Sequence, residues 1–291
     1  MIAVVGAAGT IGRNVVRFLE EWGEEVRRRD FRLEGEEFVD AREVGSVARA
    51  VEGCAVCVNC ADYRLNIEVM RGAREAGAHY LDLGGLFHVT RRQLELHEEF
   101  RGAGLTAILG IGSAPGKTNL LARAAVERLD EEPRTLELWA VTRDPAAVGH
   151  PFPAPYSVRT LLDELHMRPM VVHGGEITDV EPLSGEAERE FPDPIGRAKG
   201  IYTLHSELAT LPETYPSLQE ASFRLCLSPG LLEKLLAVKE GEEPEPYTQS
   251  PGSVAVHLVE ARDGGEPVVG MTDTRGGSAR STSEPAARGA V

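Results

Sequence analysis

Three glycines near the N-terminus have a spacing that could bind a diphosphate. The segment Gly6-Ala-Ala-Gly9-Thr-Ile-Gly12 follows a short apolar run and opens an amphipathic stretch. A turn that joins a strand to a helix in this way presents backbone N–H groups to the phosphates of a dinucleotide. Its first spacing is one residue longer than the standard fingerprint, and a merely structural tight turn is the alternative. The predicted cofactor contacts in this turn are Gly6, Ala8, Gly9, Thr10, Ile11 and Gly12.

A carboxylate follows where the adenosine end of such a cofactor would lie. Asp30 comes at the end of the second strand-like run, and a carboxylate there accepts hydrogen bonds from ribose hydroxyls, which favours NAD. Arg32 could instead pair with the 2′-phosphate of NADP, and a solvated charge cluster is the third alternative. The segment from Asp30 to Asp40 is short for a crossover, so we expect a loop there. The remaining predicted cofactor contacts are Asp40, Ala41, Cys60, Ala61 and Asp62.

Three cysteines, Cys54, Cys57 and Cys60, have a spacing that suggests a metal or cluster site. The apolar run 55–60 is typical of a strand, in which side chains alternate between the two faces. Cys57 is therefore expected to point away from Cys54 and Cys60, and Cys226 lies in another domain. We interpret these cysteines as small buried hydrophobic residues and predict no metal site.

Two further catalytic motifs are excluded by counting. Around Gly116-Lys117-Thr118 the preceding glycines stand at the wrong distance for an ATP-binding loop. A glycine-rich turn beside the cofactor is the expected role of this segment. The Tyr-x-x-x-Lys pair of short-chain dehydrogenases is also missing, because no tyrosine has a lysine four residues later.

Other polar residues stand near the ends of strand-like runs, where open parallel sheets bind ligands. Asp62, Tyr80 and Asp82 have such positions, and each could equally be a cap or a satisfied polar group. His205 is a candidate for a direct role in the site, with an ordinary domain-interface histidine as the alternative. The predicted catalytic residues are Asp82, His205 and Tyr80.

The pattern of elements predicts an α/β fold with a doubly wound parallel sheet and a second α+β domain. Short apolar runs alternate with amphipathic stretches over residues 1–118, as expected for strands separated by helices. From about residue 135, strand-like runs stand among proline-rich turns, so 119–275 are predicted to form the second domain. Residues 276–291 read as a frayed tail or a truncated closing helix.

Composition excludes several classes of protein. Of 291 residues, 42% are hydrophobic and 26% are charged, close to globular averages. The formal net charge of −15 opposes a broad electrostatic interaction with nucleic acid or an anionic membrane. Four cysteines do not make a disulfide scaffold, and there is no basic leader or long apolar run. We therefore expect a cytoplasmic protein with no nucleic-acid or membrane partner.

Several motifs, taken in order, resemble the saccharopine dehydrogenase family. Besides the glycine turn, they are Asn59-Cys-Ala61, Tyr80-Leu-Asp-Leu-Gly-Gly85, the segment 110–119, Thr160-Leu-Leu-Asp-Glu164 and Thr203-Leu-His-Ser-Glu207. Each is modest, but their collinear order over residues 1–230 is specific. Within the family, the wording Ala-Pro-Gly-x-x-Asn at 114–119 is more similar to lysine 6-dehydrogenase-like and uncharacterised bacterial members.

The resemblance implies a Rossmann domain and a second domain for substrate binding and homodimer formation. It also implies hydride transfer between NAD, or alternatively NADP, and the C–N carbon of an amino acid or related amine. Lys117 and Arg159 are the candidates for pairing with a substrate carboxylate. The expected substrate contacts are Gly84, Pro115, Gly116, Lys117, Tyr156 and Arg159. A non-catalytic dinucleotide-binding sensor or partner subunit is the alternative, since the chain is shorter than usual members.

Overall fold

The computed structural model describes residues 1–150, 152–154, 156–239 and 247–291. The chain forms two compact units, one made of Met1–Gly116 with Thr282–Val291, the other of Lys117–Ser281. The sequence analysis did not anticipate that the last ten residues join the first unit. They do so because Ala286, Ala287 and Ala290 are buried in its apolar core.

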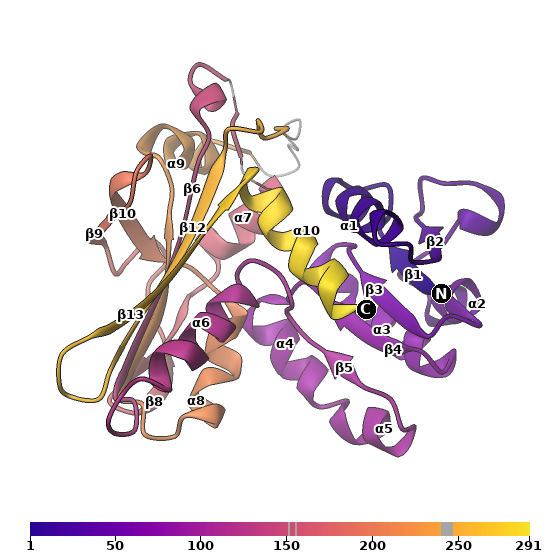
Figure 1. Cartoon of the computed structure of the whole chain (residues 1–291), viewed down its shortest axis with the longest axis horizontal. Coiled ribbons are helices and arrows are strands. Elements are labelled where there is room, and N and C mark those ends of the chain that lie inside the picture. The colour runs from indigo at the N-terminus through magenta and orange to yellow at the C-terminus, as the bar shows by residue number, and fades with distance from the viewer. Residues whose placement is uncertain (151, 155, 240–246) are drawn as a thin grey trace. The chain divides into compact units, whose positions relative to one another are not determined.

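The first unit contains a five-stranded, fully parallel sheet with the strand order β2-β1-β3-β4-β5 (Figure 1). Its strands are β1 (Ile2–Val5), β2 (Val26–Arg29), β3 (Val56–Asn59), β4 (His79–Asp82) and β5 (Ala107–Ile108). Its helices are α1 (Thr10–Glu21), η1 (Gly35–Glu37), α2 (Val44–Val51), η2 (Tyr63–Leu65), α3 (Asn66–Glu75), α4 (Leu86–Leu94) and α5 (His97–Gly102). The helix α10 (Gly277–Gly289) ends in this unit.

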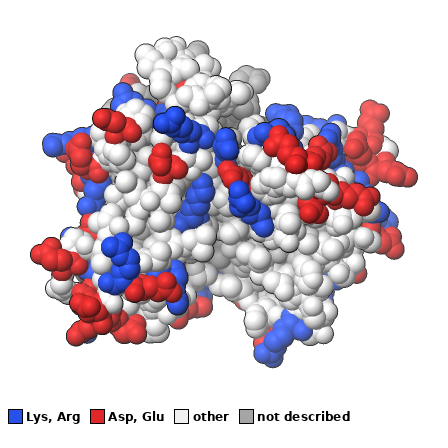
Figure 2. Space-filling model, in the orientation of Figure 1, with Lys and Arg blue, Asp and Glu red and all other residues white. Residues whose placement is uncertain are grey.

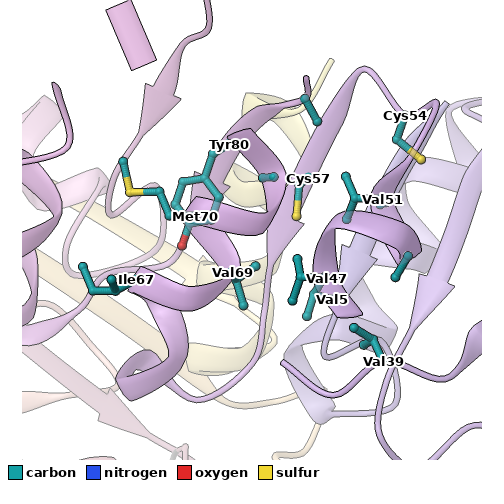
Figure 3. Close-up of a cluster of buried hydrophobic side chains, with 14 of the residues drawn as sticks. Val5, Val39, Val47, Val51, Cys54, Cys57, Ile67, Val69, Met70 and Tyr80 are labelled. Atoms are coloured by element: carbon teal, nitrogen blue, oxygen red, sulfur yellow. The ribbon is translucent and has the colours of Figure 1, made fainter. Parts of the chain in front are cut away.

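Both faces of this sheet are covered, which is why the strands β1 and β3 are almost continuously apolar. Along β1, Ala3 and Val5 belong to a core cluster with α2 and α3, whereas Ile2 and Val4 belong to a cluster with α1 and α10. Figure 3 shows the cluster on the α2–α3 side, with Tyr80 and Met70 at one end of it. The predicted doubly wound, Rossmann-like sheet is confirmed.

Some local predictions for this unit were wrong. The pattern of residues 89–101 predicts a single helix, but the stretch forms two, α4 and α5, and α4 begins at Leu86. The pattern of residues 37–39 predicts a brief strand, but the structure has only an isolated bridge between Asp30 and Phe38. The short segment after Asp30 is indeed a loop, with η1 as its one helical turn among the described residues.

The cysteine side chains also differ from the prediction. Cys54 and Cys57 share one core cluster, and only Cys60 packs against the cluster on the other face (Figure 3). The alternation rule failed for Cys54 because this residue precedes β3 instead of lying on it. Burial raises the pKa of the Cys60 thiol to about 12, and burial raises the pKa of Cys57 as well. No group of three or more His, Cys, Asp or Glu side chains in the described residues could hold a metal ion.

The second unit is built on an eight-stranded mixed sheet, in agreement with the predicted α+β class. Its strands are β6 (Thr135–Arg143), β7 (Met170–His173), β8 (Glu176–Asp179), β9 (Ala187–Phe191), β10 (Gly196–Tyr202), β11 (Glu220–Cys226), β12 (Val254–Arg262) and β13 (Val268–Arg275). The main order is β13-β12-β6-β11-β10-β9, and β7 pairs with both β11 and β8. Among the described strands of this second unit, only β6 and β11 pair in parallel.

Helices in the second unit are short. They are α6 (Lys117–Val126), η3 (Pro145–Ala147), α7 (Val158–His166), η4 (Ser206–Ala209), α8 (Leu211–Thr214) and α9 (Pro229–Leu236). Helix α6 packs on β12 and β13 (Figure 1). Strand β12 is central and buried over nearly its whole length, whereas the edge strand β13 alternates between half-buried and exposed residues.

Candidate functional site

The glycine-rich turn between β1 and α1 can be made only with glycine at two of its positions. Gly6 has a φ of +81°, and a Cβ there would lie 2.6 Å from the backbone of Cys60 and Ala61. A Cβ on Gly12 would lie 2.1 Å from the carbonyl oxygen of Gly6. Gly9 begins α1, and no side chain of the described residues caps that helix end. The first turn of α1 therefore presents its N–H groups as a site for an anion.

A cavity of about 530 Å³ opens beside this turn. It lies at the carboxyl ends of β1, β2 and β3. Strand β1 is the switch point of the sheet, because β2 lies on one side of it and β3, β4 and β5 lie on the other. This is the place at which open α/β sheets bind nucleotides. Its lining residues are Val5, Gly6, Gly9, Asp30, Phe31, Arg32, Phe38, Val39, Asp40, Ala41, Arg42, Cys60, Ala61, Asp62 and Leu65.

Most of the predicted cofactor contacts are brought together by this cavity. Gly6, Gly9, Asp30, Arg32, Asp40, Ala41, Cys60, Ala61 and Asp62 line it, whereas Ala8, Thr10, Ile11 and Gly12 belong to the turn and helix end beside it. The sequence analysis missed the exposed aromatic residues Phe31 and Phe38, and it missed Arg42. Flat aromatic side chains at a cavity wall are suited to stacking on a purine base.

Asp30 is more a structural anchor of the turn than a free ribose acceptor. Its Oδ2 accepts from the N–H of Ala8 at 3.0 Å, and its Oδ1 accepts from the N–H of Arg32 at 2.9 Å. The side chain is only 1% exposed, whereas that of Arg32 is 56% exposed. The carboxylate on which the NAD prediction rests thus already has protein partners.

Two other acidic residues of the cavity are neutralised locally. Asp40 forms a two-point ion pair with Arg42, with Nη2–Oδ2 at 2.6 Å, which lowers the pKa of Asp40 to about 2. Asp62 caps η2 by accepting from the N–H of Arg64, and it also pairs with the Arg64 guanidinium at 3.0 Å. Asp62 was predicted either to touch the ligand or to cap a helix, and the structure shows the cap.

Tyr80 and Asp82, two predicted catalytic residues, are buried inside the first unit. Tyr80 is 1% exposed and packs in the core cluster of Figure 3, where its hydroxyl contacts Asn59 and Asn66. Asp82 is 0% exposed. Burial raises the pKa of both groups. Neither side chain is exposed to a ligand at the surface of this unit.

Asp82 instead holds together the loops that follow β4 and β5. Its Oδ1 accepts from the N–H of Gly84 at 2.9 Å and of Gly110 at 2.7 Å. Its Oδ2 accepts from the side-chain amides of Asn66 and Gln93. These four donors are neutral amides, and the Tyr80 hydroxyl, which also bonds Asp82, is kept neutral by burial. The arrangement therefore favours a structural role.

The predicted substrate contacts fall into two groups. Gly84, Pro115 and Gly116 belong to the first unit, and Gly116 adopts a φ of +118° close to the backbone of Gly112. In the second unit the Lys117 ammonium donates to Thr274 Oγ1 at 2.8 Å and to Ser281 Oγ at 3.0 Å. The remaining two predicted contacts also belong to the second unit, where Arg159 is exposed and Tyr156 is half-buried.

His205 lies in a buried polar network of the second unit. Its Nδ1 is 3.1 Å from Glu207 Oε2, and Glu207 Oε1 accepts from the hydroxyl of Thr118 at 2.6 Å. On the other side of the ring, Nε2 is 3.8 Å from Glu164 Oε2, which accepts from the hydroxyl of Tyr156 at 2.5 Å. Phe223 stacks on the imidazole at 3.6 Å between centroids.

Burial and charge set the protonation of this network. Burial raises the pKa of Glu164 to about 7, although the neighbouring His205 opposes the shift. Burial disfavours charge on His205 and Glu207, but their mutual attraction outweighs it, so the pKa of His205 is raised and that of Glu207 is lowered. The sequence analysis named His205 and Tyr156 but missed Glu164, Glu207 and Thr118. These three residues belong to the motifs that carry the family resemblance, and this was the only indication in the sequence that could have pointed to them.

Figure 2 shows acidic and basic side chains interspersed over the face in view. No helix among the described residues is both long and apolar enough to cross a membrane.

Comparison with known proteins identifies the first unit. Residues 2–108 match the family model described as "Saccharopine dehydrogenase NADP binding domain". The chain is 24% identical over 205 residues to the carboxyaminopropylagmatine dehydrogenase of Synechocystis sp., covering 68% of this chain and 51% of that protein. It is 25% identical over 191 residues to the carboxynorspermidine synthase of Vibrio alginolyticus, covering 62% of this chain and 45% of that protein. The chain thus spans about half the length of these curated relatives.

A solved structure shows the same fold over nearly the whole chain. The apo saccharopine dehydrogenase (L-Glu forming) of Saccharomyces cerevisiae superposes with a TM-score of 0.63 at 12% identity, covering 98% of this chain and 89% of that one. The nucleotide cavity therefore stands in a domain whose cofactor class is a nicotinamide dinucleotide. Residues 2–108 of this chain are thus similar to the NADP-binding domain of saccharopine dehydrogenases, as the sequence motifs indicated.

Proposed function

We propose that this chain is an NAD(P)-dependent oxidoreductase that transfers hydride between nicotinamide and the C–N carbon of an amino acid or related amine. The observation that carries the proposal is the glycine turn with its cavity at the switch point of the sheet, within residues that match the family's NADP-binding domain. The names of the two curated relatives also denote enzymes of amine compounds.

The chemistry sets requirements that the residues must meet. A bound dinucleotide supplies the hydride acceptor, and the protein must hold the reacting carbon within about 3–3.5 Å of it. Gly6, Gly9 and the N-terminal turn of α1 would hold the diphosphate. A protonated amine cannot release hydride, so a neighbouring base must first take a proton from it. Arg159 and Lys117 remain the proposed partners of a substrate carboxylate, with Gly84, Pro115, Gly116 and Tyr156 as further contacts.

Within this function we propose a preference for NADP over NAD. Asp30 is already bonded by backbone N–H groups and by Arg32 Nε at 3.3 Å. The rest of the Arg32 guanidinium is exposed at the cavity, and so is that of Arg42 although it pairs with Asp40. Arginine is well suited to binding a 2′-phosphate. Replacing Arg32 with Ala should weaken NADPH binding by roughly tenfold to a hundredfold, the cost of one charge-assisted hydrogen bond, and should leave NADH binding nearly unchanged. Calorimetric titration measures both, with Arg17→Ala on α1 as the control.

Turnover is tested after binding is established. The wild-type chain is incubated with the preferred oxidised cofactor and a panel of amino acids and polyamine conjugates, and reduced nicotinamide is followed by its absorbance. We expect cofactor binding and turnover of at least one secondary or primary amine. Absence of cofactor binding would overturn the proposal, and binding without turnover would favour a dinucleotide-binding sensor or partner subunit. The proposed homodimer is tested by sedimentation at the assay concentration.

A further inference from the structure

The second unit contains a chain of buried polar groups that begins at a half-buried tyrosine. The Tyr156 hydroxyl donates to Glu164, and Glu164 faces the imidazole of His205, whose other nitrogen contacts Glu207. The four side chains come from three segments: the loop before α7, α7 itself, and η4 with the residue before it. The hydrogen bond from Tyr156 to Glu164 is a path for a proton, whereas the 3.8 Å contact between Glu164 and His205 is an electrostatic one.

Mechanical bracing does not account for these residue types. Glu164, His205 and Glu207 are 3%, 5% and 0% exposed, and apolar residues of similar volume would hold the same elements together without the desolvation cost. The network is also incompletely bonded, because His205 Nε2 is buried without a hydrogen-bond partner in the described residues. Perturbed, partly satisfied ionisable groups concentrate where proteins move protons.

The charges around Glu164 leave it as the group that changes state near neutral pH. His205 and Glu207 stabilise each other's charged forms. His257 on β12 faces this pair and Lys117 of α6, and burial lowers its pKa to about 4, so it is neutral. Asp163, the next residue on α7, adds a weak repulsion. Tyr156 stays neutral because burial and Glu164 raise its pKa well above the ordinary value.

We propose that the Tyr156 hydroxyl contacts the substrate amine and that Glu164 receives, through this hydroxyl, the proton that the amine must lose before hydride transfer. This inference rests on the proposed function and adds the acid–base groups to it. The substrate ammonium gives a proton to Tyr156 Oη while the proton of Tyr156 moves to Glu164 Oε2. Tyr156 is neutral before and after, Glu164 becomes a neutral acid, and the amine becomes neutral.

The next step then balances. A bound dinucleotide would accept the hydride that the neutral amine loses from its carbon, and the substrate would become an iminium ion. His205 and Glu207 do not touch the substrate in this scheme. They are positioning residues. The positive charge of the protonated imidazole lowers the pKa of Glu164, which lets this carboxyl group ionise more readily. Glu207, which accepts a hydrogen bond from Thr118, keeps the imidazole protonated and oriented.

The pH profile of kcat/KM tests the assignment. In the oxidative direction the wild-type rate should rise with pH and level off above about pH 7, since Glu164 must be ionised; in the reductive direction it should fall over the same range. Glu164→Gln should lower the plateau value of kcat/KM by roughly a hundredfold or more, the usual contribution of a general base. It should also remove the rising part of the pH profile, called the limb below. Glu188→Gln, a change at an exposed carboxylate of β9, is the matched control and should leave the profile unchanged.

Two further variants separate the relay from a structural role. Tyr156→Phe should lower the rate at every pH, whereas Tyr202→Phe, at a hydroxyl that accepts from Arg224, should not. His205→Gln should shift the limb to higher pH and retain most of the plateau rate, because the positive neighbour that lowers the pKa of Glu164 is gone. A uniform loss of rate with an unshifted limb in His205→Gln, or a wild-type limb in Glu164→Gln, would overturn the proposal.

A readout without turnover distinguishes failure of the relay from failure of the proposed function. Infrared difference spectra during a pH titration should show a protonated carboxyl that disappears near pH 7 in the wild type and is missing in Glu164→Gln. If that band is present but no amine is oxidised, the proposed function is wrong, although Glu164 does take up a proton near neutral pH. If amines are oxidised but no such carboxyl titrates, the relay is wrong and the function stands.

Discussion

Each unit of this chain buries a carboxylate inside a polar network, and the two networks differ in their partners. Asp82 in the first unit accepts from the backbone of Gly84 and Gly110 and from two side-chain amides. Glu164 in the second unit accepts from Tyr156 and faces His205. Burial raises the pKa of both carboxyl groups, so a raised pKa does not distinguish them.

What distinguishes them is whether the partners can change protonation. The four amide donors to Asp82 do not titrate and belong to loops and helices that the carboxylate holds in place. The Tyr80 hydroxyl also bonds Asp82, but burial raises the pKa of this phenol well above its ordinary value, so it stays neutral. The partners of Glu164 are a phenol and an imidazole with an unbonded nitrogen. Neutral, saturated networks rigidify a fold, whereas titratable and incompletely bonded ones are typical of sites that move protons.

The largest expected effect is on the stability of the first unit. Asp82→Leu leaves two buried backbone N–H groups, of Gly84 and Gly110, without their acceptor. At about 1–3 kcal/mol for each unsatisfied donor, we expect a loss of about 4 kcal/mol in the free energy of unfolding. Urea unfolding followed by the fluorescence of Trp22, in a Trp139→Phe background, measures it in this unit.

Asp82→Asn is the matched control for that prediction. The asparagine carbonyl can still accept from Gly84 and Gly110, and a rotated Gln93 amide can accept from the new NH₂ group. Stability should therefore be largely retained, and the pH profile of turnover should keep its wild-type shape. A hundredfold loss of rate in a stable Asp82→Asn variant would instead make Asp82 a participant in the reaction.

The first unit was predicted better than the second because its elements can be recognised from residues that are close together in the sequence. An apolar strand, a glycine turn and an amphipathic helix follow one another directly from Ile2 to Glu21, so periodicity and spacing were sufficient. The ends of neighbouring parallel strands meet at one edge, which also placed Cys60 and Ala61 beside the turn. Phe31 and Phe38 were missed because they lie on a loop whose path depends on tertiary contacts.

The network of the second unit could not be assembled from the sequence. Thr118, Tyr156, Glu164 and Glu207 come from segments up to 89 residues apart, and only the packing of α6, α7 and η4 brings them together. Its position at a strand end favoured Asp82 over Glu164 as a candidate catalytic residue. That rule locates the edge of a sheet where ligands bind, but it does not say which side chains there already have all their hydrogen bonds made within the protein. Saturation is a property of the folded structure alone.

An intermediate effect is expected in the pH dependence of stability of the second unit. The pKa of Glu164 rises from 4.5 to about 7 on folding, so the folded state holds this proton more tightly. The associated stabilisation is complete below about pH 4.5 and is lost as pH rises to about 7. Relative to Glu164→Gln, the wild type should lose on the order of 3 kcal/mol across this range. Trp139 fluorescence in a Trp22→Phe background reports it, and parallel curves would contradict it.

The smallest effect concerns the hydroxyl of Thr118, which bonds Glu207 at 2.6 Å. Thr118→Val removes a charge-assisted hydrogen bond and should cost about 2 kcal/mol of stability. Thr142→Val removes a neutral hydroxyl contact with Ser278 in the same unit and should cost only about 1 kcal/mol. The Thr118 bond also lowers the pKa of Glu207, so without it the carboxylate is a stronger acceptor for the protonated His205, and the pKa of the imidazole should rise. Titration of the His205 ring protons by NMR measures this shift. An unshifted His205 in Thr118→Val would mean that Thr118 braces α6 and does not tune the relay.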